Sequence, residues 1–266
     1  MKMHDTIDRT RPTSARIYDY MLGGCHHFEP DRIVAEQILS IFPQARMAAQ
    51  VNRGFLRRAV RFMIESGIRQ FLDIGSGIPA TGNVHEVAQE RCPQARILYV
   101  DMDPVAVAHG VEILASNDRA AMIQGDLRQL PEIFAHREAR RLLDLSQPLG
   151  LICGAVFHFF PEESEVRSIL NCLRQSMATD SQLALSHSTL DGIPLEITQT
   201  AERLYASFKS PLRHRSRVEV EALFDGLELV EPGVVYSASW HPDGSEELLF
   251  ADPQLSHAVA GVARKR

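Results

Sequence analysis

At 266 residues, with 45% hydrophobic and 23% charged residues, the chain has the composition of a globular protein that can bury one large core, which excludes wholesale disorder. Its formal net charge of −6 supplies no basic surface of the kind that nucleic-acid binders carry, so no nucleic-acid partner is expected. Because no run of about 18 apolar residues and no signal peptide is visible, we expect a cytoplasmic protein without membrane contact.

The first quarter of the chain is predicted to be helical. Residues 15–28 read ARIYDYMLGGCHHF, in which aromatic residues precede two adjacent glycines, and this predicts a short helix that ends at a flexible turn. Apolar residues at helical spacing predict a second helix that stops at Pro43 and a third over about 45–66. We expect residues 1–66 to form a helical lid. The clustered arginines of the third helix are interpreted as a solvated face: Arg53, Arg57, Arg58 and Arg61.

From Arg69 onward, apolar runs alternate with helical stretches. RQFLDIGSG, ARILYVDMD and AAMIQGDL each open a strand–loop–helix unit, PLGLICGAVFHFF is apolar on both faces, and SQLALSH predicts a fifth strand. The last third combines two short helices with LELVEPGVVYSASW and SHAVAGVARK, which indicates an antiparallel finish. The alternation predicts an α/β domain over residues 67–266 with a mostly parallel sheet.

The sharpest motif closes the first of these strands and reads Asp73-Ile74-Gly75-Ser76-Gly77. Ligands of open α/β sheets bind beyond the carboxyl ends of the strands, where glycines allow a tight turn and close approach. Continued to Ala80, the run also fits the G-x-G-x-x-G/A pattern of dinucleotide sites. A carboxylate at Asp73 repels a pyrophosphate and attracts a cofactor that carries an ammonium and a sulfonium. The alternative is that Asp73 only caps the turn.

The second and third strands end in further aspartates. Asp101-Met102-Asp103 follows the second strand, where Asp101 can accept hydrogen bonds from ribose hydroxyls and Asp103 can cap the helix that begins at Pro104. Gln124-Gly125-Asp126-Leu127 follows the third strand, where an acidic side chain can accept from an adenine amine. Three such aspartates on consecutive strand tips, beside a glycine turn, predict a nucleoside-containing cofactor.

These motifs resemble those of class I S-adenosylmethionine-dependent methyltransferases. More narrowly, the chain resembles the actinobacterial-type S-adenosyl methyltransferase family, whose substrates are mostly undefined, through SARIYDYMLGG, NRGFLRRAVRFM, QFLDIGSGIPATGNVHEVAQ, YVDMDPV, HFFPEE and RSRVEVEALFDGLELVEPGVV. The resemblance implies a Rossmann-like, seven-stranded, mostly parallel sheet with a reversed last hairpin. It also implies S-adenosyl-L-methionine as cofactor, with these binding residues: Asp73, Gly75, Ser76, Gly77, Asp101, Met102, Asp126, Leu127, and, in the closing lid, Tyr18, Gly23 and Gly24.

Catalytic candidates come from the fourth and fifth strands. His158 follows the fourth strand, whose tip faces the transferring methyl in this kind of fold, and His187 ends the fifth. An imidazole titrates near neutral pH and is suited to general-base catalysis. The alternative is a structural histidine hydrogen-bonded beneath the cofactor. Methyl transfer to a good nucleophile needs mainly proximity and alignment, so no base is strictly required.

The sequence therefore predicts a methyltransferase that acts on a small-molecule acceptor. An RNA methyltransferase and a non-catalytic S-adenosylmethionine-binding protein are the alternatives. No metal is expected, because the adjacent residues Cys25-His26-His27 rarely point into one site and the four cysteines form no CxxC pair. The family often has a Lys-Asp or His-Asn pair at this point of the lid, so the acceptor of this chain is expected to differ. The oligomeric state is not predicted.

Overall fold

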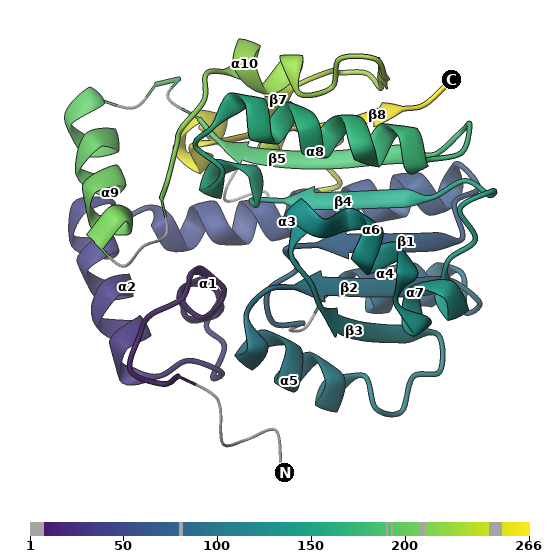
Figure 1. The fold of residues 1–266 in the computed structure, drawn as a ribbon. Helices are drawn as coiled ribbons and strands as arrows, with labels where there is room; N and C mark the ends of the chain where they lie inside the picture. Colours follow the sequence, from purple (N-terminus) through teal and green to yellow (C-terminus); the bar gives the residue numbers. More distant parts are fainter. Residues whose placement is uncertain (1–7, 80–81, 190, 193, 208–210, 245–251) are drawn as a thin grey trace.

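One central sheet organises the computed structural model, which describes residues 8–79, 82–189, 191–192, 194–207, 211–244 and 252–266 (Figure 1). Its strands follow the order β3-β2-β1-β4-β5-β8-β6, and β7 pairs with β8 beside β6. The first five strands are parallel, and β8 runs antiparallel to β5. The strands are β1 (Gln70–Ile74), β2 (Arg96–Asp101), β3 (Ala120–Gln124), β4 (Gly150–Gly154), β5 (Gln182–Ser188), β6 (Glu228–Leu229), β7 (Val235–Tyr236) and β8 (Ala258–Arg264).

The predicted Rossmann-like α/β fold is confirmed, but the sheet has eight strands where seven were expected. The extra strand arises because residues 228–236 meet β8 in two short segments. Between them the chain leaves the ladder in a turn at Gly233, whose φ is +82° and whose amide donates to the carbonyl of Val230 at 2.8 Å. Pro232 in the same turn has no amide hydrogen for strand pairing. One expected strand is thereby divided into β6 and β7.

Helices cover both faces of the sheet and bury it completely. On one face α3, α4 and α5 pack against apolar residues of the strands, and on the other face α6, α7, α8 and α10 do so. A sheet buried on both sides explains why β1 and β4 read as continuous apolar runs. These helices are α3 (Ala45–Glu65), α4 (Val84–Arg91), α5 (Pro104–Ile113), α6 (Leu130–Ala135), α7 (Arg137–Leu142), α8 (Glu163–Ser176) and α10 (Arg217–Ala222).

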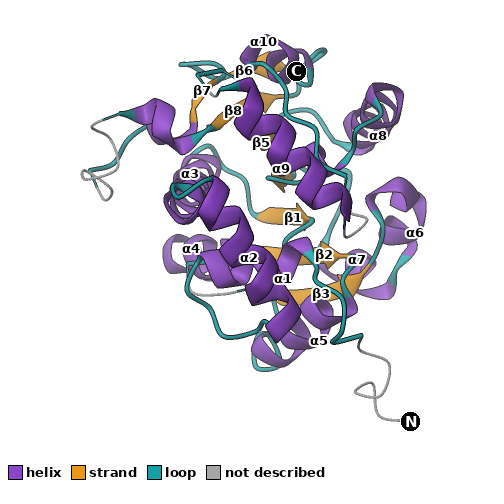
Figure 2. Cartoon of the chain, turned by 90° about the vertical axis from the view of Figure 1, so that its left-hand side faces the viewer, coloured by secondary structure: helices purple, strands orange, loops and turns teal. Residues whose placement is uncertain are grey.

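Three further helices stand beyond the carboxyl ends of the parallel strands, at the left of Figure 1 and towards the viewer in Figure 2. They are α1 (Ser14–Met21), α2 (Glu29–Ile41) and α9 (Leu195–Ser207). The first two share a small apolar cluster that is distinct from the two sheet cores; it includes Ile17, Met21, Val34 and Ile38, and Ala49 of α3 also belongs to it. By contrast α3, which belongs to the predicted lid by sequence position, packs on the sheet. No helix among the described residues is long and apolar enough to cross a membrane.

Candidate active site

The glycine turn after β1 is an open corner at the carboxyl edge of the sheet. Gly75 and Gly77 have φ values of +66° and +64°, in the region that favours glycine. A Cβ at Gly75 would lie 2.5 Å from Cγ2 of Val156, so no larger residue fits there, whereas a Cβ at Gly77 would meet no atom within 4 Å. Ser76 lies between them and is half-buried. The turn thus presents free space at Gly77. Ala80, the last residue of the motif, lies outside the described residues.

Asp101 is held at the tip of β2 by the backbone of two loops. Its Oδ2 accepts from the amide of Gly77 at 2.8 Å, and its Oδ1 accepts from the amide of Asp103 at 2.8 Å. Burial raises the pKa of Asp101 to about 6, against these two hydrogen bonds. Each carboxylate oxygen has two lone pairs, so both can still accept a further hydrogen bond. The carboxylate is therefore oriented in advance.

Asp103 caps α5 as the sequence predicted, and it also contacts the N-terminal helices. Its Oδ1 accepts from the amide of Val105 at 2.9 Å, which satisfies a free donor of the first helical turn. Its Oδ2 accepts from the hydroxyl of Thr13 at 2.6 Å. Because Thr13 is the N-cap of α1, this bond joins the start of α1 to the tip of β2. A second contact joins the same regions, since the rings of His26 and His109 lie 4.5 Å apart.

A pocket of about 420 Å³ opens where β3 ends. Met102 lines it and is 62% exposed, so its side chain is free to contact a ligand there. Asp126 also lines it, and its Oδ1 accepts from the amide of Arg128 at 2.9 Å. Leu127 begins the next turn and is buried. The other lining residues are Ile123, Gln124, Gly125, Gln129, Glu132, Ile133 and His136.

Asp73 is a buried carboxylate without a donor. Only 4% of the residue is exposed, and no hydrogen bond to its side chain is found within the described part of the chain. Burial raises its pKa to about 7; the positive charge of Arg53 opposes this rise, and the carboxylate of Asp101 adds to it. It does not cap the glycine turn through a hydrogen bond from any described residue. An ionised carboxylate in this position lacks a cation in direct contact.

The arginines of α3 are not a solvated face, contrary to the sequence interpretation. Arg53 and Arg58 are only 8% and 4% exposed. Arg58 donates to the carbonyls of Trp240 and Ser237 at 2.8 and 2.7 Å, because the chain after β7 folds over that side of α3. Arg53 points to the carboxyl edge, where its Nη1 donates to Oδ1 of Asn83. The sequence analysis therefore missed two buried guanidinium groups.

The predicted lid residues lie around the turn that ends α1. The Tyr18 hydroxyl donates to the carbonyl of Ala49 at 3.1 Å and accepts from Nδ2 of Asn52 at 2.9 Å, which fixes its ring against α3. Gly23 has a φ of +80°, and a Cβ at Gly24 would lie 2.1 Å from Oδ1 of Asp19. Both glycines are thus required by the turn itself.

The two predicted catalytic histidines have different surroundings. His187 is buried, and both of its nitrogens have partners: Nδ1 lies 2.7 Å from the carbonyl of Ser188, and Nε2 lies 2.8 Å from Nη1 of Arg215. His158 lies in the 3-10 turn η3 (Phe157–Phe159), directly after β4, and its buried Nδ1 has no partner in the described structure. Burial holds the pKa of His158 well below its ordinary value, and nearby His187, His214 and Arg215 lower it further.

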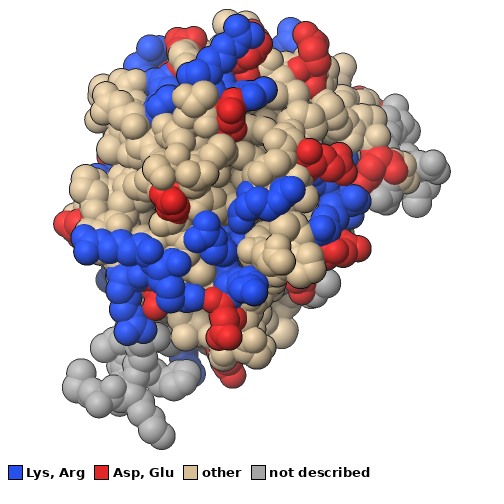
Figure 3. All heavy atoms as spheres, turned by 90° about the vertical axis from the view of Figure 1, so that its right-hand side faces the viewer, with Lys and Arg blue, Asp and Glu red and all other residues tan. Residues whose placement is uncertain are grey.

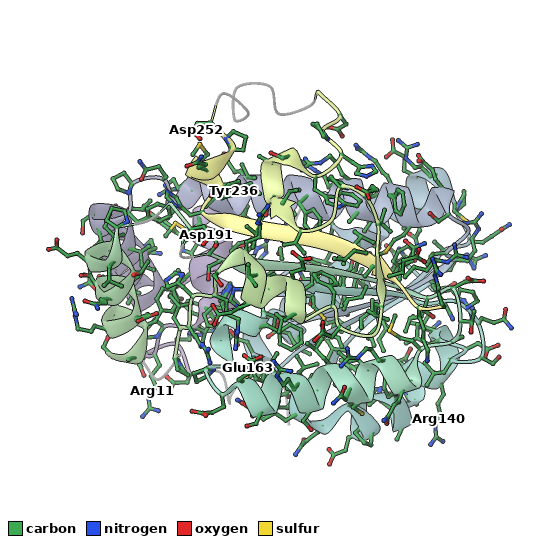
Figure 4. The ribbon with its side chains drawn as sticks, turned by 90° about the horizontal axis from the view of Figure 1, so that it is seen from above. Arg11, Arg140, Glu163, Asp191, Tyr236 and Asp252 are labelled. Atoms are coloured by element: carbon green, nitrogen blue, oxygen red, sulfur yellow. The ribbon has the colours of Figure 1, made fainter. Side chains whose placement is uncertain are left out.

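Arg215 fastens the turn that carries His158. Its guanidinium donates to the carbonyls of Phe157 and Phe160 at 3.1 and 3.0 Å and pairs with Glu163 at 3.3 Å. Figure 4 shows Glu163 at the end of α8 nearest α9, whereas Arg140 lies at the opposite edge of the molecule. His187 is therefore part of the support beneath His158.

The described residues contain no group of three or more His, Cys, Asp or Glu side chains arranged to hold a metal ion. In the triplet considered from sequence, Cys25 is exposed, the amide of His26 donates to Asp19 at 2.8 Å, and Nε2 of His27 lies 3.1 Å from the carbonyl of Gly24. Sγ of Cys25 lies 4.0 Å from Nδ1 of His26, whereas the ring of His27 turns to the backbone.

Comparisons with known proteins agree with this geometry. The sequence profile of a family described as S-adenosyl methyltransferase matches residues 1–266. A candidate methyltransferase from Thermobifida fusca YX is 36% identical, with 96% of each chain covered and a TM-score of 0.90. A duf574 family protein from Streptomyces avermitilis is also 36% identical, with 97% of this chain and 99% of that chain covered and a TM-score of 0.91.

More distant structures share the fold alone. The mitomycin 7-O-methyltransferase MmcR is 19% identical, with 93% of this chain and 60% of that chain covered and a TM-score of 0.52. No curated protein matches the sequence.

Proposed function

We propose that this chain, which belongs to the S-adenosyl methyltransferase family, transfers the methyl group of S-adenosylmethionine to a small-molecule acceptor. Membership of the family makes it an S-adenosylmethionine-dependent methyltransferase. The observation that carries the proposal for this chain is the carboxylate of Asp73, which is buried without a donor beside the free space at Gly77. Such a site fits the ammonium group at the amino-acid end of this cofactor and not a pyrophosphate.

We assign the remaining cofactor contacts by their place along the edge. Asp101, already oriented by two amides, accepts from the ribose hydroxyls through its remaining lone pairs. Met102 covers the adenine, and Asp126 and Leu127 bind its polar edge at the pocket after β3. The turn Gly75-Ser76-Gly77 borders the methionine portion.

The acceptor side is assigned to the tips of β4 and β5. The bound cofactor supplies an electrophilic methyl group on a sulfonium. His158 is neutral at pH 7 and has an unpartnered nitrogen, so we assign it the role of taking the proton from an acceptor hydroxyl. We give His187 a positioning role, since both of its nitrogens already bind Arg215 and Ser188. Exclusion of water by the helices above would strengthen these interactions.

We propose that α1 and α2 form the mobile cover of this site, with Tyr18, Gly23 and Gly24 at its inner turn. They share an apolar cluster separate from the cores of the sheet, and contact the tip of β2 through Thr13 and Asp103. On this proposal the cover ends before α3, which packs on the sheet, rather than at residue 66.

A small molecule is favoured over RNA by the charge of the chain. The net charge is −6, so the chain has no overall excess of basic groups. Figure 3 shows the face at the opposite end of the sheet from the strand tips, where basic groups are interrupted by acidic side chains. A phosphate backbone needs a continuous basic surface for affinity.

Cofactor binding is tested by thermal denaturation. A ligand at a hundredfold excess over its Kd stabilises the folded state by about 2.7 kcal/mol. S-adenosylhomocysteine is therefore expected to raise the Tm clearly, whereas NAD at the same concentration leaves it unchanged. A rise with NAD alone would contradict the assignment of Asp73 to an ammonium.

The pH dependence of cofactor affinity follows from the two buried carboxyls. Their pKa values are raised, to about 7 for Asp73 and about 6 for Asp101, so their neutral forms stabilise the protein at low pH and this stability is lost as the pH rises through those values. The ammonium of the cofactor prefers the ionised form. We therefore expect calorimetry to show affinity for S-adenosylhomocysteine at least about 10-fold weaker at pH 5.5 than at pH 8. Asp73→Asn should bind S-adenosylhomocysteine weakly at both pH values. If the affinity of this variant still changed with pH as much as that of the wild type, a group other than Asp73 would cause the pH dependence.

A further inference from the structure

We propose that Arg53 and Asn83 bind the carboxylate of the cofactor's amino-acid moiety while Asp73 binds its ammonium, so that the three residues form one zwitterion site. The inference rests on the proposed function, and it adds two residues to which neither the motifs nor the family comparison gives a role. Three features of the structure support it.

The first feature is a pair of buried donors that lack acceptors. Nε of Arg53 and Nδ2 of Asn83 are both inaccessible to solvent and have no hydrogen-bond partner among the residues that the structure describes. Asn83 itself is only 1% exposed. Buried polar groups in folded proteins are nearly always paired, so each unpaired donor requires an explanation. The two donors belong to side chains that already contact each other, Arg53 and Asn83. An anion that binds between or beside these side chains would accept from both donors.

The second feature is the position of Asn83 at the start of α4. Asparagine is favoured at a helix N-cap because its side-chain oxygen accepts from the first helical amides. Here Asn83 is the N-cap, yet its side chain makes no capping bond. Its Oδ1 accepts from Nη1 of Arg53 instead, which turns the amide of Asn83 away from the helix. The asparagine is therefore oriented by Arg53 and not by its helix.

The third feature is the relation between Arg53 and Asp73. The positive charge of Arg53 opposes the rise that burial causes in the pKa of Asp73. No direct ion pair joins them among the described residues. Arg53 is held back by Asn83 and by the ring of Tyr18, whose centroid lies 5.8 Å from its guanidinium carbon. Two opposite charges kept apart in a buried site match the two charges of an α-amino acid, and arginine is well suited to carboxylates.

A different explanation is that Arg53 only offsets the charge of Asp73. In that case the carboxylate of the cofactor would gain no affinity from Arg53. Loss of the arginine would then weaken binding only by changing the charge of Asp73. The two explanations are separated by ligands that lack one or both charges of the amino acid.

The experiment measures three Kd values by calorimetry at pH 8, with the full-length protein. The probes are S-adenosylhomocysteine, its decarboxylated analogue, which keeps the amine, and 5′-methylthioadenosine, which lacks both groups. The variants are Arg53→Met and Asn83→Ala, and the matched control is Arg61→Met, on the same helix but paired with the partly exposed Asp243. Circular dichroism and Tm verify the folding of each variant.

We expect Arg53→Met to weaken S-adenosylhomocysteine about 10- to 100-fold and Asn83→Ala to weaken it less, with the two smaller probes within about twofold of the wild type. Arg61→Met should bind all three probes as the wild type does. Equal weakening of S-adenosylhomocysteine and its decarboxylated analogue by Arg53→Met would overturn the inference, because Arg53 would then act through Asp73.

The wild-type protein provides a test that does not depend on the folding of a variant. It should bind S-adenosylhomocysteine at least about 10-fold more tightly than the decarboxylated analogue. Equal affinity for the two would overturn the carboxylate site but leave cofactor binding intact. Failure to bind S-adenosylhomocysteine at all would instead contradict the proposed function.

Discussion

Replacement of His158 by glutamine is expected to lower the rate of methyl transfer about 10²- to 10⁴-fold and to leave cofactor affinity within about twofold. His158 follows β4 in the turn that Arg215 fastens, and its Nδ1 has no partner among the described residues. Glutamine keeps a similar size and polarity but cannot take a proton, so the substitution isolates the role of the base.

The rate is measured in single turnovers with labelled S-adenosylmethionine and the best acceptor from a screen of phenols and other hydroxyl compounds. Because the pKa of His158 lies well below its ordinary value, its imidazole stays neutral, and at saturating cofactor its ionisation should not reduce the wild-type rate between about pH 6.5 and 8. His241→Gln, an exposed position after β7, is the control. An unchanged rate in His158→Gln would mean that alignment alone drives the transfer.

The aspartates could be placed from the sequence because strand ends are local features. Each apolar run that leads to Asp73, Asp101 or Asp126 has its own turn signal, and parallel topology brings successive carboxyl ends to one edge. The interrupted strand was not foreseen, because only pairing with β8, some 30 residues later, distinguishes β6 and β7 from one continuous strand.

The buried arginines show where sequence periodicity fails. The apolar positions of α3 face the sheet. Arg53 and Arg58 lie outside this apolar stripe, so they were interpreted as solvated. Arg58 is covered by residues 237–240, far away in the sequence, and Arg53 by the end of α1. One signal was present: α3 contains several arginines but only one acidic residue, Glu65, whereas an exposed helix usually carries acidic residues one turn away from its basic ones.

The second large effect is expected in the cover. Asp31 and Arg16 form an ion pair at 3.1 Å and are 0% and 1% exposed. Asp31 also accepts from the amide of Thr13 at 3.0 Å, which joins α2 to the start of α1, and from the amide of Phe28 at 2.8 Å, which caps α2 itself. Asp31→Ala leaves a buried cation and two amides without this partner. Removal of one member of a buried pair costs about 3–5 kcal/mol.

We expect this cost to fall on α1 and α2, because they share a cluster separate from the sheet cores. In Asp31→Ala, amide hydrogen exchange should therefore speed up sharply over residues 14–41 and remain slow in β1 to β5. The affinity for S-adenosylhomocysteine should fall. Saturating S-adenosylhomocysteine should restore part of the protection from exchange. Glu36→Ala is the control: its pair with Arg46 is exposed, so a change below about 1 kcal/mol is expected. Equal loss of protection throughout the sheet would mean that α1 and α2 unfold together with the sheet core. Unchanged cofactor affinity would mean that α1 and α2 do not cover the site.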